Sequence, residues 1–326
     1  MTFRFSFTLR HWAAGAALAG LASAATAAEF PTQPVRLVVG TPAGGAIDVY
    51  TRIVANGLSG ELGQPVLVEN RTGAAGNIAA QSVLQQPADG HTLWVGTQAM
   101  VEINPSAFKQ MPWQPGDFTP IIRGIEAPLV LVTHPSVPAK TLPELVEWVK
   151  SKPGTGYASF SPGTPSHFLG YQFSNDLDLD MIHIPYRGSA PQATDLAGGH
   201  SLLGFSQIQS TLQLIQDGRL NAIATTGVER SRFLPDVPTL QELGHPEMNT
   251  TIWFGIMAPS KTPQDVQQRL TEAFAKVHAD PQVRAKLEEA GYDVSGETGA
   301  SFAQSIADSR KRWAGLVEAS GFEAGK

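Results

Sequence analysis

The 326-residue sequence contains no cysteine. This absence excludes disulfide bonds, thiolate chemistry and any metal site that is built on cysteine ligands. It also leaves no cysteine to which an exported protein could attach a lipid anchor. A long hydrophobic segment is missing as well, because no apolar run approaches the roughly 20 residues that span a bilayer. We therefore expect no membrane insertion.

Positive charge is scarce too. Lys and Arg number 23 against 29 Asp and Glu, which gives a formal net charge of −6 at pH 7. An acidic chain has little attraction for nucleic acid or anionic lipid, so we expect neither as a partner. Any anionic ligand must then be bound by local N–H groups rather than by overall charge. The eight histidines form no His-x-x-x-His pair, so we expect no metal site.

The motifs of several common enzyme classes are also absent. The glycine-rich stretch 40–45 is not followed by Gly-Lys-Ser or Gly-Lys-Thr, and its spacing is not Gly-x-Gly-x-x-Gly. It therefore matches neither a phosphate-binding loop nor a dinucleotide fingerprint. No Gly-x-Ser-x-Gly sequence marks a hydrolase nucleophile, and no paired carboxylates occupy the candidate binding turns. We expect a binding protein without a cofactor rather than an enzyme.

Residues 1–28 have the three parts of a secretory signal peptide. Arg4 and Arg10 provide a positive start, residues 13–22 form a short apolar core, and residues 25–28 are small enough for cleavage. A membrane anchor is the alternative interpretation, but the apolar core is too short to span a bilayer. We expect export to the periplasm, where the mature chain would diffuse freely.

Helix and strand patterns alternate along the remaining residues, which number about 300 and suffice for two domains. An apolar, β-branched run predicts a buried strand at 34–40, and Thr141 with Glu144 has the pattern of a capping box. The β-α-β-α-β order predicts an α/β fold with doubly wound, parallel sheets. Further strands are expected at 65–70, 92–97, 129–134, 157–161, 181–186, 202–206, 220–227 and 253–259, and helices at 46–62, 77–86, 166–175, 209–216, 263–278, 281–290 and 301–319.

The two βαβ halves are not separated by a low-complexity tract or a linker, so we expect two lobes that the chain crosses more than once. We assign residues 29–125 and 252–326 to lobe 1 and residues 126–251 to lobe 2. Ligands of open α/β sheets bind at the C-terminal ends of the strands. If the lobes face each other, the turns at those ends meet in one interdomain cleft.

Four of these turns provide candidate ligand-binding residues. A strand that enters a helix through a glycine turn leaves backbone N–H groups free, and these suit a small carboxylate. Ser and Thr hydroxyls can donate to the carboxylate as well, although in many turns they bond locally. The candidates are Thr41, Ala43, Gly44, Gly45, Asp48, Thr97, Gln98, Ser159, Ser161, Thr164, Ser166, Arg187, Gly188, Ser189 and Ala190.

Several of these side chains have a second interpretation. Asp48 can contact the ligand or its water, or it can stabilise the dipole of the helix in whose first turn it lies. Arg187 can pair with a carboxylate in bidentate fashion, or it can be solvated while the neighbouring backbone binds the ligand. His167 follows the third turn, and we favour a role in helix packing over ligand binding. Trp113 is expected in the core or on a lobe surface.

A series of motifs occurs in a defined order along essentially the whole mature chain. The motifs are PVRLVV at 34–39, GGAID at 44–48, GQPV at 63–66, ENR at 69–71, GAAGNI at 73–78, DGHTL at 89–93, INP at 103–105, IPYRGSAP at 184–191, DLAGG at 195–199, LPDVPT at 234–239 and WFG at 253–255. In this order they resemble the periplasmic substrate-binding proteins of tripartite tricarboxylate transporters, the Bug-type receptors.

The resemblance implies a two-lobed periplasmic binding protein, a Venus flytrap that closes on a small carboxylate. It also implies that turn N–H groups and ordered water hold the carboxylate, and that membrane components of a tripartite tricarboxylate transporter receive the ligand. The family's turns correspond here to residues 43–45, 159–167 and 186–190. The usual Ala-Pro-Gly-Gly order reads Pro-Ala-Gly-Gly at 42–45, a change that can alter the shape of this turn.

A second departure bears on the ligand. The family's Phe-Asp-Asn reads Phe205-Ser206-Gln207 here, so Ser206 becomes a candidate ligand residue at a position where a carboxylate is common. If this position faces the ligand, the ammonium group of an amino acid loses its partner, which would cost several kcal/mol. Among dicarboxylates, citrate-like acids and aromatic carboxylates such as terephthalate, we therefore favour a dicarboxylate or an aromatic acid without an amino group.

Two other functions fit the same sequence features. A receptor that presents its ligand to a sensor kinase would use the same closing clamp, and a structural exported protein is a third possibility. Labelled substrate uptake in a deletion strain separates transport from sensing. We expect the receptor to be a monomer.

Overall fold

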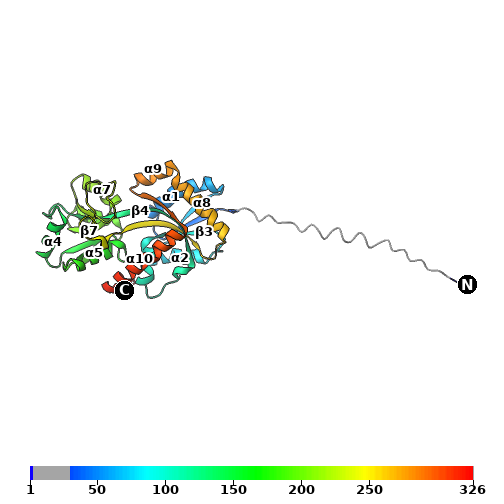
Figure 1. The fold of residues 1–326 in the computed structure, drawn as a ribbon, viewed down its shortest axis with the longest axis horizontal. Coiled ribbons are helices and arrows are strands. Elements are labelled where there is room, and N and C mark those ends of the chain that lie inside the picture. Colours follow the sequence, from blue (N-terminus) through cyan, green and yellow to red (C-terminus); the bar gives the residue numbers. More distant parts are fainter. Residues whose placement is uncertain (3–29, 326) are drawn as a thin grey trace.

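The computed structural model describes residues 1–2 and 30–325, and residues 30–325 fold into two lobes (Figure 1). The predicted signal peptide lies outside the described residues, apart from Met1 and Thr2. None of the helices in the described part has the length and apolar character that a membrane crossing requires. Both lobes consist of helices packed on a sheet, which confirms the α/β class, but the sheets are mixed rather than purely parallel.

Lobe 1 has the strand order β2–β1–β3–β9–β4, with β10 on the other edge of β4. Strands β1, β2 and β3 are parallel, as the β-α-β-α-β pattern predicts, whereas β9 is antiparallel to both β3 and β4. The elements are β1 (Val35–Val39), α1 (Ala46–Leu62), β2 (Val66–Asn70), α2 (Asn77–Leu84), β3 (Thr92–Thr97), α3 (Asn104–Ala107), β9 (Thr251–Pro259), α8 (Gln264–Ala279), α9 (Pro281–Glu289), β10 (Asp293–Thr298) and α10 (Gly299–Ser320).

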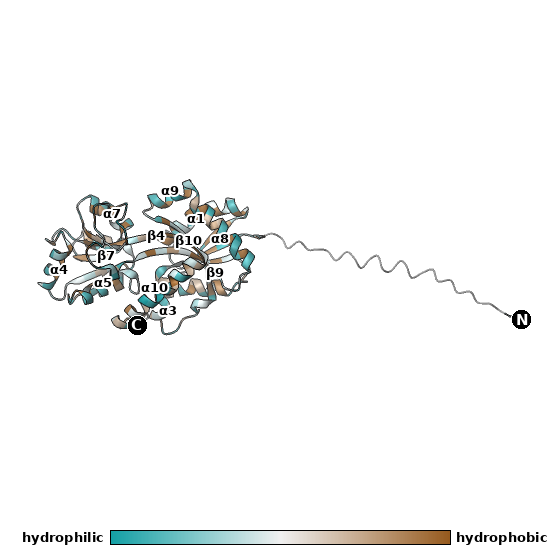
Figure 2. Ribbon diagram, in the orientation of Figure 1, coloured by the Kyte–Doolittle hydropathy of each residue, from teal (hydrophilic) through white to brown (hydrophobic). Residues whose placement is uncertain are grey.

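Alternate residues of the lobe 1 strands face two helical layers. Leu37 and Val39 pack in the core that includes α1 and α8, whereas Val38 packs in a second core with α2 and α10. This arrangement follows from the period of two along a strand that is covered on both faces. Figure 2 shows hydrophilic and hydrophobic residues alternating along the surrounding helices, as expected for helices with one buried face.

Lobe 2 has the strand order β6–β5–β7–β4, and β8 also pairs with β4. Strands β5, β6 and β7 are parallel, while β4 is antiparallel to β7 and β8. The elements are α4 (Leu142–Lys150), β5 (Gly156–Ser159), α5 (Pro165–Asp176), β6 (Ile182–Pro185), α6 (Ser189–Ala197), β7 (Leu203–Gln207), α7 (Ile208–Gln216) and β8 (Asn221–Thr225). Short helical turns elsewhere are η1 (Ala74–Gly76), η2 (Ala99–Ile103), η3 (Pro115–Asp117) and η4 (Pro246–Met248).

Strand β4 (Phe118–Thr133) belongs to both sheets. It pairs with β9 as far as Pro128 and with β7 from Leu129 onward, so it carries the chain from one lobe to the other. The sequence pattern predicted only its last part, from Leu129 onward, because Pro120, Gly124 and Pro128 interrupt the earlier part. Register shifts between Pro120 and Ile122 and again around Gly124 accommodate these residues. The chain returns to lobe 1 at the start of β9.

The end of α10 forms a third connection between the lobes. Phe168 of α5 lies against Trp313 of α10 and Phe322 of the C-terminal tail. The Tyr171 hydroxyl donates to the Ala319 carbonyl over 2.7 Å. The Arg312 guanidinium donates to the Asn249 carbonyl and to the Gln172 side chain. The C-terminal helix α10 of lobe 1 therefore contacts lobe 2 directly, at α5 and at Asn249.

The crossover strands β4 and β9 help to line two cavities between the lobes. Residues at the ends of β3 and β7 line one cavity, whose side we call the front. Residues after β8 and Asp293 at the start of β10 line the other, whose side we call the back. The pairings direct the carboxyl ends of β1, β3, β5, β6 and β7 toward the gap. The turns that follow these strands therefore face the gap, where ligands of α/β sheets bind.

Candidate functional site

A cavity of about 90 Å³ lies at the front between the lobes. Thr97 and Gln98 at the end of β3 line it from lobe 1, and Thr164 before α5 lines it from lobe 2. The structure thus brings these three predicted residues together around one cavity. The other lining residues are Ala99, Phe160, Pro165, Gln207, Ile252, Trp253 and Phe254, none of them charged.

The turn of lobe 1 is stabilised by a buried carboxylate. The side chain of Asp48 is only 2% exposed. One oxygen accepts from the Gly44 N–H and the Arg52 Nε, both over 2.9 Å, and the other accepts from the Asn70 amide over 2.9 Å. The Asn70 amide also donates to the Thr41 carbonyl. Although burial raises it, these hydrogen bonds bring the pKa of Asp48 below its usual value. Asp48 therefore fixes the turn, and this geometry favours its structural interpretation.

Three helices begin at these turns without a side-chain cap. The N-cap residues are Gly45 of α1, Thr164 of α5 and Gly188 of α6, and none of them makes a side-chain cap hydrogen bond. By contrast, Thr141 caps α4 with its side chain, as its capping-box pattern predicted. The first N–H groups of α1 and α6 are consequently available to an anion in the gap. In α5 only the Ser166 N–H is available, because Pro165 has no N–H and the His167 N–H donates to the Thr164 carbonyl.

Three buried side-chain oxygens of predicted residues have no hydrogen-bond partner in the described part of the chain. They are the Thr41 hydroxyl beside the lobe 1 turn, the Gln98 carbonyl at the cavity and the Ser206 hydroxyl near the end of β7. The Gln98 amide nitrogen donates to the Thr250 hydroxyl over 3.4 Å. Buried polar atoms in proteins are almost always paired, so these oxygens indicate a place for a ligand or for water.

The turn of lobe 2 uses most of its hydroxyls internally. Ser166 donates to the Phe205 carbonyl over 2.6 Å, and Thr164 donates to the Ser161 carbonyl over 2.6 Å. The Ser159 hydroxyl is fully buried and lies 2.6 Å from His183 Nε2. These bonds match the local interpretation of Ser and Thr in turns, and they leave backbone N–H groups as the main donors.

Two stacked histidines lie under this turn. The rings of His167 and His183 are 3.8 Å apart, and His167 Nδ1 accepts from the Gly163 N–H. Burial lowers the pKa of His183 to about 4. Burial and the neighbouring His183 together lower the pKa of His167 to about 3. Both rings are thus neutral at pH 7, and they act here as packing groups and hydrogen-bond partners.

The turn before α6 depends on a glycine. Gly188 has φ +129° and ψ 167°, a combination that is essentially restricted to glycine. Its N–H donates to the Phe160 carbonyl over 2.7 Å and so links this turn to the preceding one. Ser189 and Ala190 form the first turn of α6. Arg187 is exposed and does not line the cavity.

Some predicted residues lie away from the cavity, and some lining residues were not predicted. Thr41, Ala43, Gly44, Gly45, Ser159, Ser161, Ser166 and the 187–190 turn do not line it. Ser206 is buried with an unpartnered hydroxyl, and the next residue, Gln207, lines the cavity in its place. The same reasoning that selected Thr97 and Gln98, position at a strand end, would have selected Gln207. The β9 residues gave no such signal, because an antiparallel strand starts rather than ends at the gap.

Comparison with known proteins identifies relatives over nearly the whole chain. A family model described as the tripartite tricarboxylate transporter family receptor matches residues 50–322. The protein BugT of Bordetella pertussis is 32% identical over 321 residues, an alignment that covers 94% of both chains. An uncharacterised-family protein encoded in the gbd 5′ region of Cupriavidus necator is 32% identical, over 92% of this chain and 91% of that one.

Solved structures extend the comparison to ligands. The R. palustris protein Rpa4515, solved with adipate, is 30% identical, has a TM-score of 0.80 and covers 90% of this chain and 99% of its own. MatC from Rhodopseudomonas palustris, solved with bound malate, is 29% identical with a TM-score of 0.77 over 88% of this chain and 100% of its own.

Proposed function

This chain belongs to the tripartite tricarboxylate transporter receptor family, whose members are periplasmic solute-binding proteins, and from this premise we propose that it captures a small organic carboxylate at the front of its crossover strands. The membership agrees with the resemblance drawn from its motifs. The family is one of receptors and not an enzyme class. We further propose that the ligand is delivered to the membrane components of a tripartite tricarboxylate-type transporter.

The uncapped N-termini of α1, α5 and α6 carry this proposal. All three follow strands whose carboxyl ends face the gap, and they come from both lobes. Free N–H groups at a helix N-terminus, together with the helix dipole, favour an anion. Only the start of α5 lines the front cavity, and a carboxylate bound by N–H groups there would need no Lys or Arg, which agrees with a lining that has no charged residue.

The same lining supports a ligand without an amino group. An ammonium group enclosed here would have no Asp or Glu among the lining residues, and burying an unpaired charge costs several kcal/mol. Phe160, Ile252 and Phe254 provide apolar walls that suit an aliphatic chain or an aromatic ring. Since the similar structures contain adipate and malate, we favour a dicarboxylate, with an aromatic carboxylate such as terephthalate as the alternative.

The ligand would bind by closing the lobes around it. A ligand that contacts both lobes favours the closed form by its differential affinity for that form. We propose the hinge at the predicted lobe boundaries, 125/126 and 251/252, because β4 passes between the sheets near the first and β9 begins at the second. The transporter would then recognise the closed form.

A thermal-shift screen tests the ligand class. Adipate, malate, terephthalate and citrate are compared with aspartate and glutamate, and positives are titrated by calorimetry. At 100 times the Kd, a ligand should raise the free energy of unfolding by about 2.7 kcal/mol. X-ray scattering should show compaction with the same ligand. Tight binding of aspartate or glutamate would refute the ligand class, and the absence of any response to carboxylates would refute carboxylate capture.

A matched pair of glutamine variants tests the location of the site. Gln98→Ala changes the cavity wall and should weaken carboxylate binding about fivefold, as expected for the loss of one hydrogen bond. Gln268→Ala changes an exposed residue of α8 and should have no effect. Equal affinities for the two variants would place the ligand elsewhere. Labelled uptake in a deletion strain tests delivery, because unchanged uptake would favour a sensing role.

A further inference from the structure

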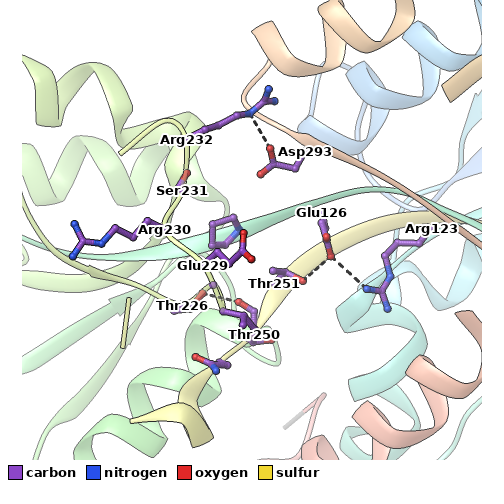
Figure 3. Close-up of a pocket in the computed structure, with 14 residues that line it drawn as sticks. Arg123, Glu126, Thr226, Glu229, Arg230, Ser231, Arg232, Thr250, Thr251 and Asp293 are labelled. Carbon is purple, nitrogen blue, oxygen red and sulfur yellow. Dashed lines mark hydrogen bonds and ion pairs between the residues drawn. The ribbon is translucent and has the colours of Figure 1, made fainter. Parts of the chain in front are cut away.

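A cavity larger than the one at the front lies at the back of the crossover strands. It has a volume of about 660 Å³ and is lined by Arg123 and Glu126 of β4, by residues 226–232 of lobe 2, and by Asp293 at the start of β10. Figure 3 shows Arg232 reaching from lobe 2 toward Asp293 of lobe 1 across this cavity. The back therefore contains a direct polar connection between the lobes.

This connection, which we call the Arg232 clasp, consists of Arg232, Glu288, Tyr292 and Asp293. Arg232 Nε is 2.8 Å from Asp293 Oδ1, and Nη1 is 3.3 Å from Glu288 Oε1. Nη2 donates to the Tyr292 carbonyl over 2.9 Å. All three nitrogens of one guanidinium are thus directed at one short segment of lobe 1, a geometry that a lysine could not reproduce.

A neighbouring arginine, Arg230, does not bond to the other lobe. Arg230 lines the same cavity and has a similar side-chain exposure, 45% against 42% for Arg232. However, Arg230 pairs with Glu242 and donates to the Pro235 carbonyl, both of which belong to lobe 2. Arg230 therefore provides a matched control for an arginine that does not join the lobes.

The front has no comparable connection. In the described part of the chain, no hydrogen bond or ion pair joins the 41–45 turn of lobe 1 to the 159–166 or 187–190 turns of lobe 2. The lobes are bonded by the Arg232 clasp, through α10, and by Gln209 of α7, whose amide donates to the Gly291 carbonyl over 2.6 Å. These turns at the front are open to a ligand. This asymmetry is typical of an open receptor.

We propose that the Arg232 clasp stabilises the open form and so sets the ligand affinity of the receptor from the side opposite to its binding site. Because β4 and β9 lie between the two sides, a hinge rotation that closes the front must widen the back. Closure then breaks the clasp, and the ligand must compensate for its loss. The apparent affinity is reduced by the rarity of the closed form in the free protein. This inference rests on the proposed function, but its first test does not.

Spin-label distances in the ligand-free protein provide this first test. Since the chain has no cysteine, the exposed pair Asn56→Cys and Thr194→Cys can be labelled alone, one in each lobe. Arg232→Gln should increase the population at the shorter, closed distance, whereas Arg230→Gln should leave the distribution unchanged. A distribution for Arg232→Gln that matches Arg230→Gln, or that moves to longer distances, would overturn the inference.

Adipate binding provides the second test. Arg232→Gln should bind adipate three- to tenfold more tightly than the parent, the range that corresponds to about 1 kcal/mol from a partly exposed set of ion pairs. Asp293→Asn should act in the same direction, and the double variant should add little to either single change. Equal adipate affinities for the Arg232→Gln and Arg230→Gln variants would overturn the inference. If no variant binds adipate while the distances shift as expected, the proposed ligand class fails and the clasp is supported.

Discussion

The front and the back of the crossover strands differ in how their polar groups are paired. At the front, each turn is stabilised within its own lobe, by Asp48 in lobe 1 and by Ser166 in lobe 2, and nothing joins the two turns. At the back, Arg232 bonds directly to the opposite lobe. In the proposed open form the bonds of Arg232 hold the lobes apart, and the free N–H groups at the front are available to a ligand.

At the front, the groups that fix the shape of a turn are different from the groups that remain free to bind a ligand. A binding turn must have a fixed shape, or each bound ligand would bear the entropy cost of ordering it. Asp48 and Asn70 fix the shape of the 41–45 turn without using the N–H groups at the start of α1. Side chains at the front thus fix the backbone of the turns, and we expect the backbone N–H groups to bind the ligand.

The largest predicted effect is that of Asp48→Ala, which tests whether this side chain fixes the shape of the 41–45 turn. Asp48→Ala leaves the Gly44 N–H and the Asn70 amide without their acceptor, and breaking such a buried charged set should cost about 3 kcal/mol of unfolding free energy. The turn should lose its shape, and carboxylate binding should be lost with it. Urea unfolding and adipate titration measure the two effects.

Arg52 provides the control for Asp48. Its side chain is 51% exposed, so Arg52→Ala should change the stability little and preserve binding. If Asp48→Ala proves as mild as Arg52→Ala, the turn does not depend on the buried carboxylate.

The next effect concerns the glycine of the 187–190 turn. Gly188→Ala introduces a side chain at a φ and ψ that glycine alone adopts easily, which should cost about 2 to 3 kcal/mol and weaken adipate binding. Gly218→Ala, at φ +69° after α7, should cost about 1 kcal/mol and leave binding unchanged. Equal affinities for the two variants would exclude the 187–190 turn from the site.

Much of the fold could be predicted from the sequence, because the periodicity of apolar residues reports burial. Helix 46–62 was predicted with the bounds that α1 has. Strand direction could not be predicted in this way, since a buried strand has the same composition whether it runs parallel or antiparallel. This explains why the sheets were expected to be parallel although β9 runs against β3. Strand β10 was missed because its alternating residues are only half buried.

The candidate site was predictable at the level of turns but not of atoms. Gly, Ser and Thr after an apolar run mark a turn wherever it lies, so the turns at 41–45 and 159–166 were found. Which oxygens remain free depends on partners from other strands, as when Asn70 of β2 reaches the Thr41 carbonyl. The Arg232 clasp had no signal at all, because its partners lie about 60 residues away in the sequence.

The pH dependence of stability measures the contribution of His167 and His183, the two histidines under the turn of lobe 2. The pKa values of His167 and His183, about 3 and about 4, lie below the ordinary 6.5. Their stabilising contribution is therefore complete above pH 6.5 and is lost as the pH falls toward 4, because the unfolded chain takes up the protons first. If both rings were fully buried, the free energy of unfolding would fall by about 2 kcal/mol for each ring between pH 7 and pH 5. Because the rings are partly exposed, we expect a total loss of about 2 kcal/mol for the two rings together.

A double variant isolates this contribution. His167→Asn retains an acceptor near the Nδ1 position for the Gly163 N–H, and His183→Gln retains a partner near Nε2 for Ser159. Urea unfolding at pH 7 and pH 5 should show that the double variant loses about 2 kcal/mol less than the parent. Equal losses would mean that the histidines do not control the acid sensitivity of the front.

The smallest effect is expected at Ser206. Its hydroxyl is buried without a partner, so Ser206→Ala removes an unpaired polar group and should stabilise the protein by up to about 1 kcal/mol. Because Gln207 rather than Ser206 lines the cavity, adipate affinity should not change. A loss of affinity would instead show that the Ser206 hydroxyl reaches the ligand through water. In that case the free polar atoms of the front would extend beyond the cavity wall.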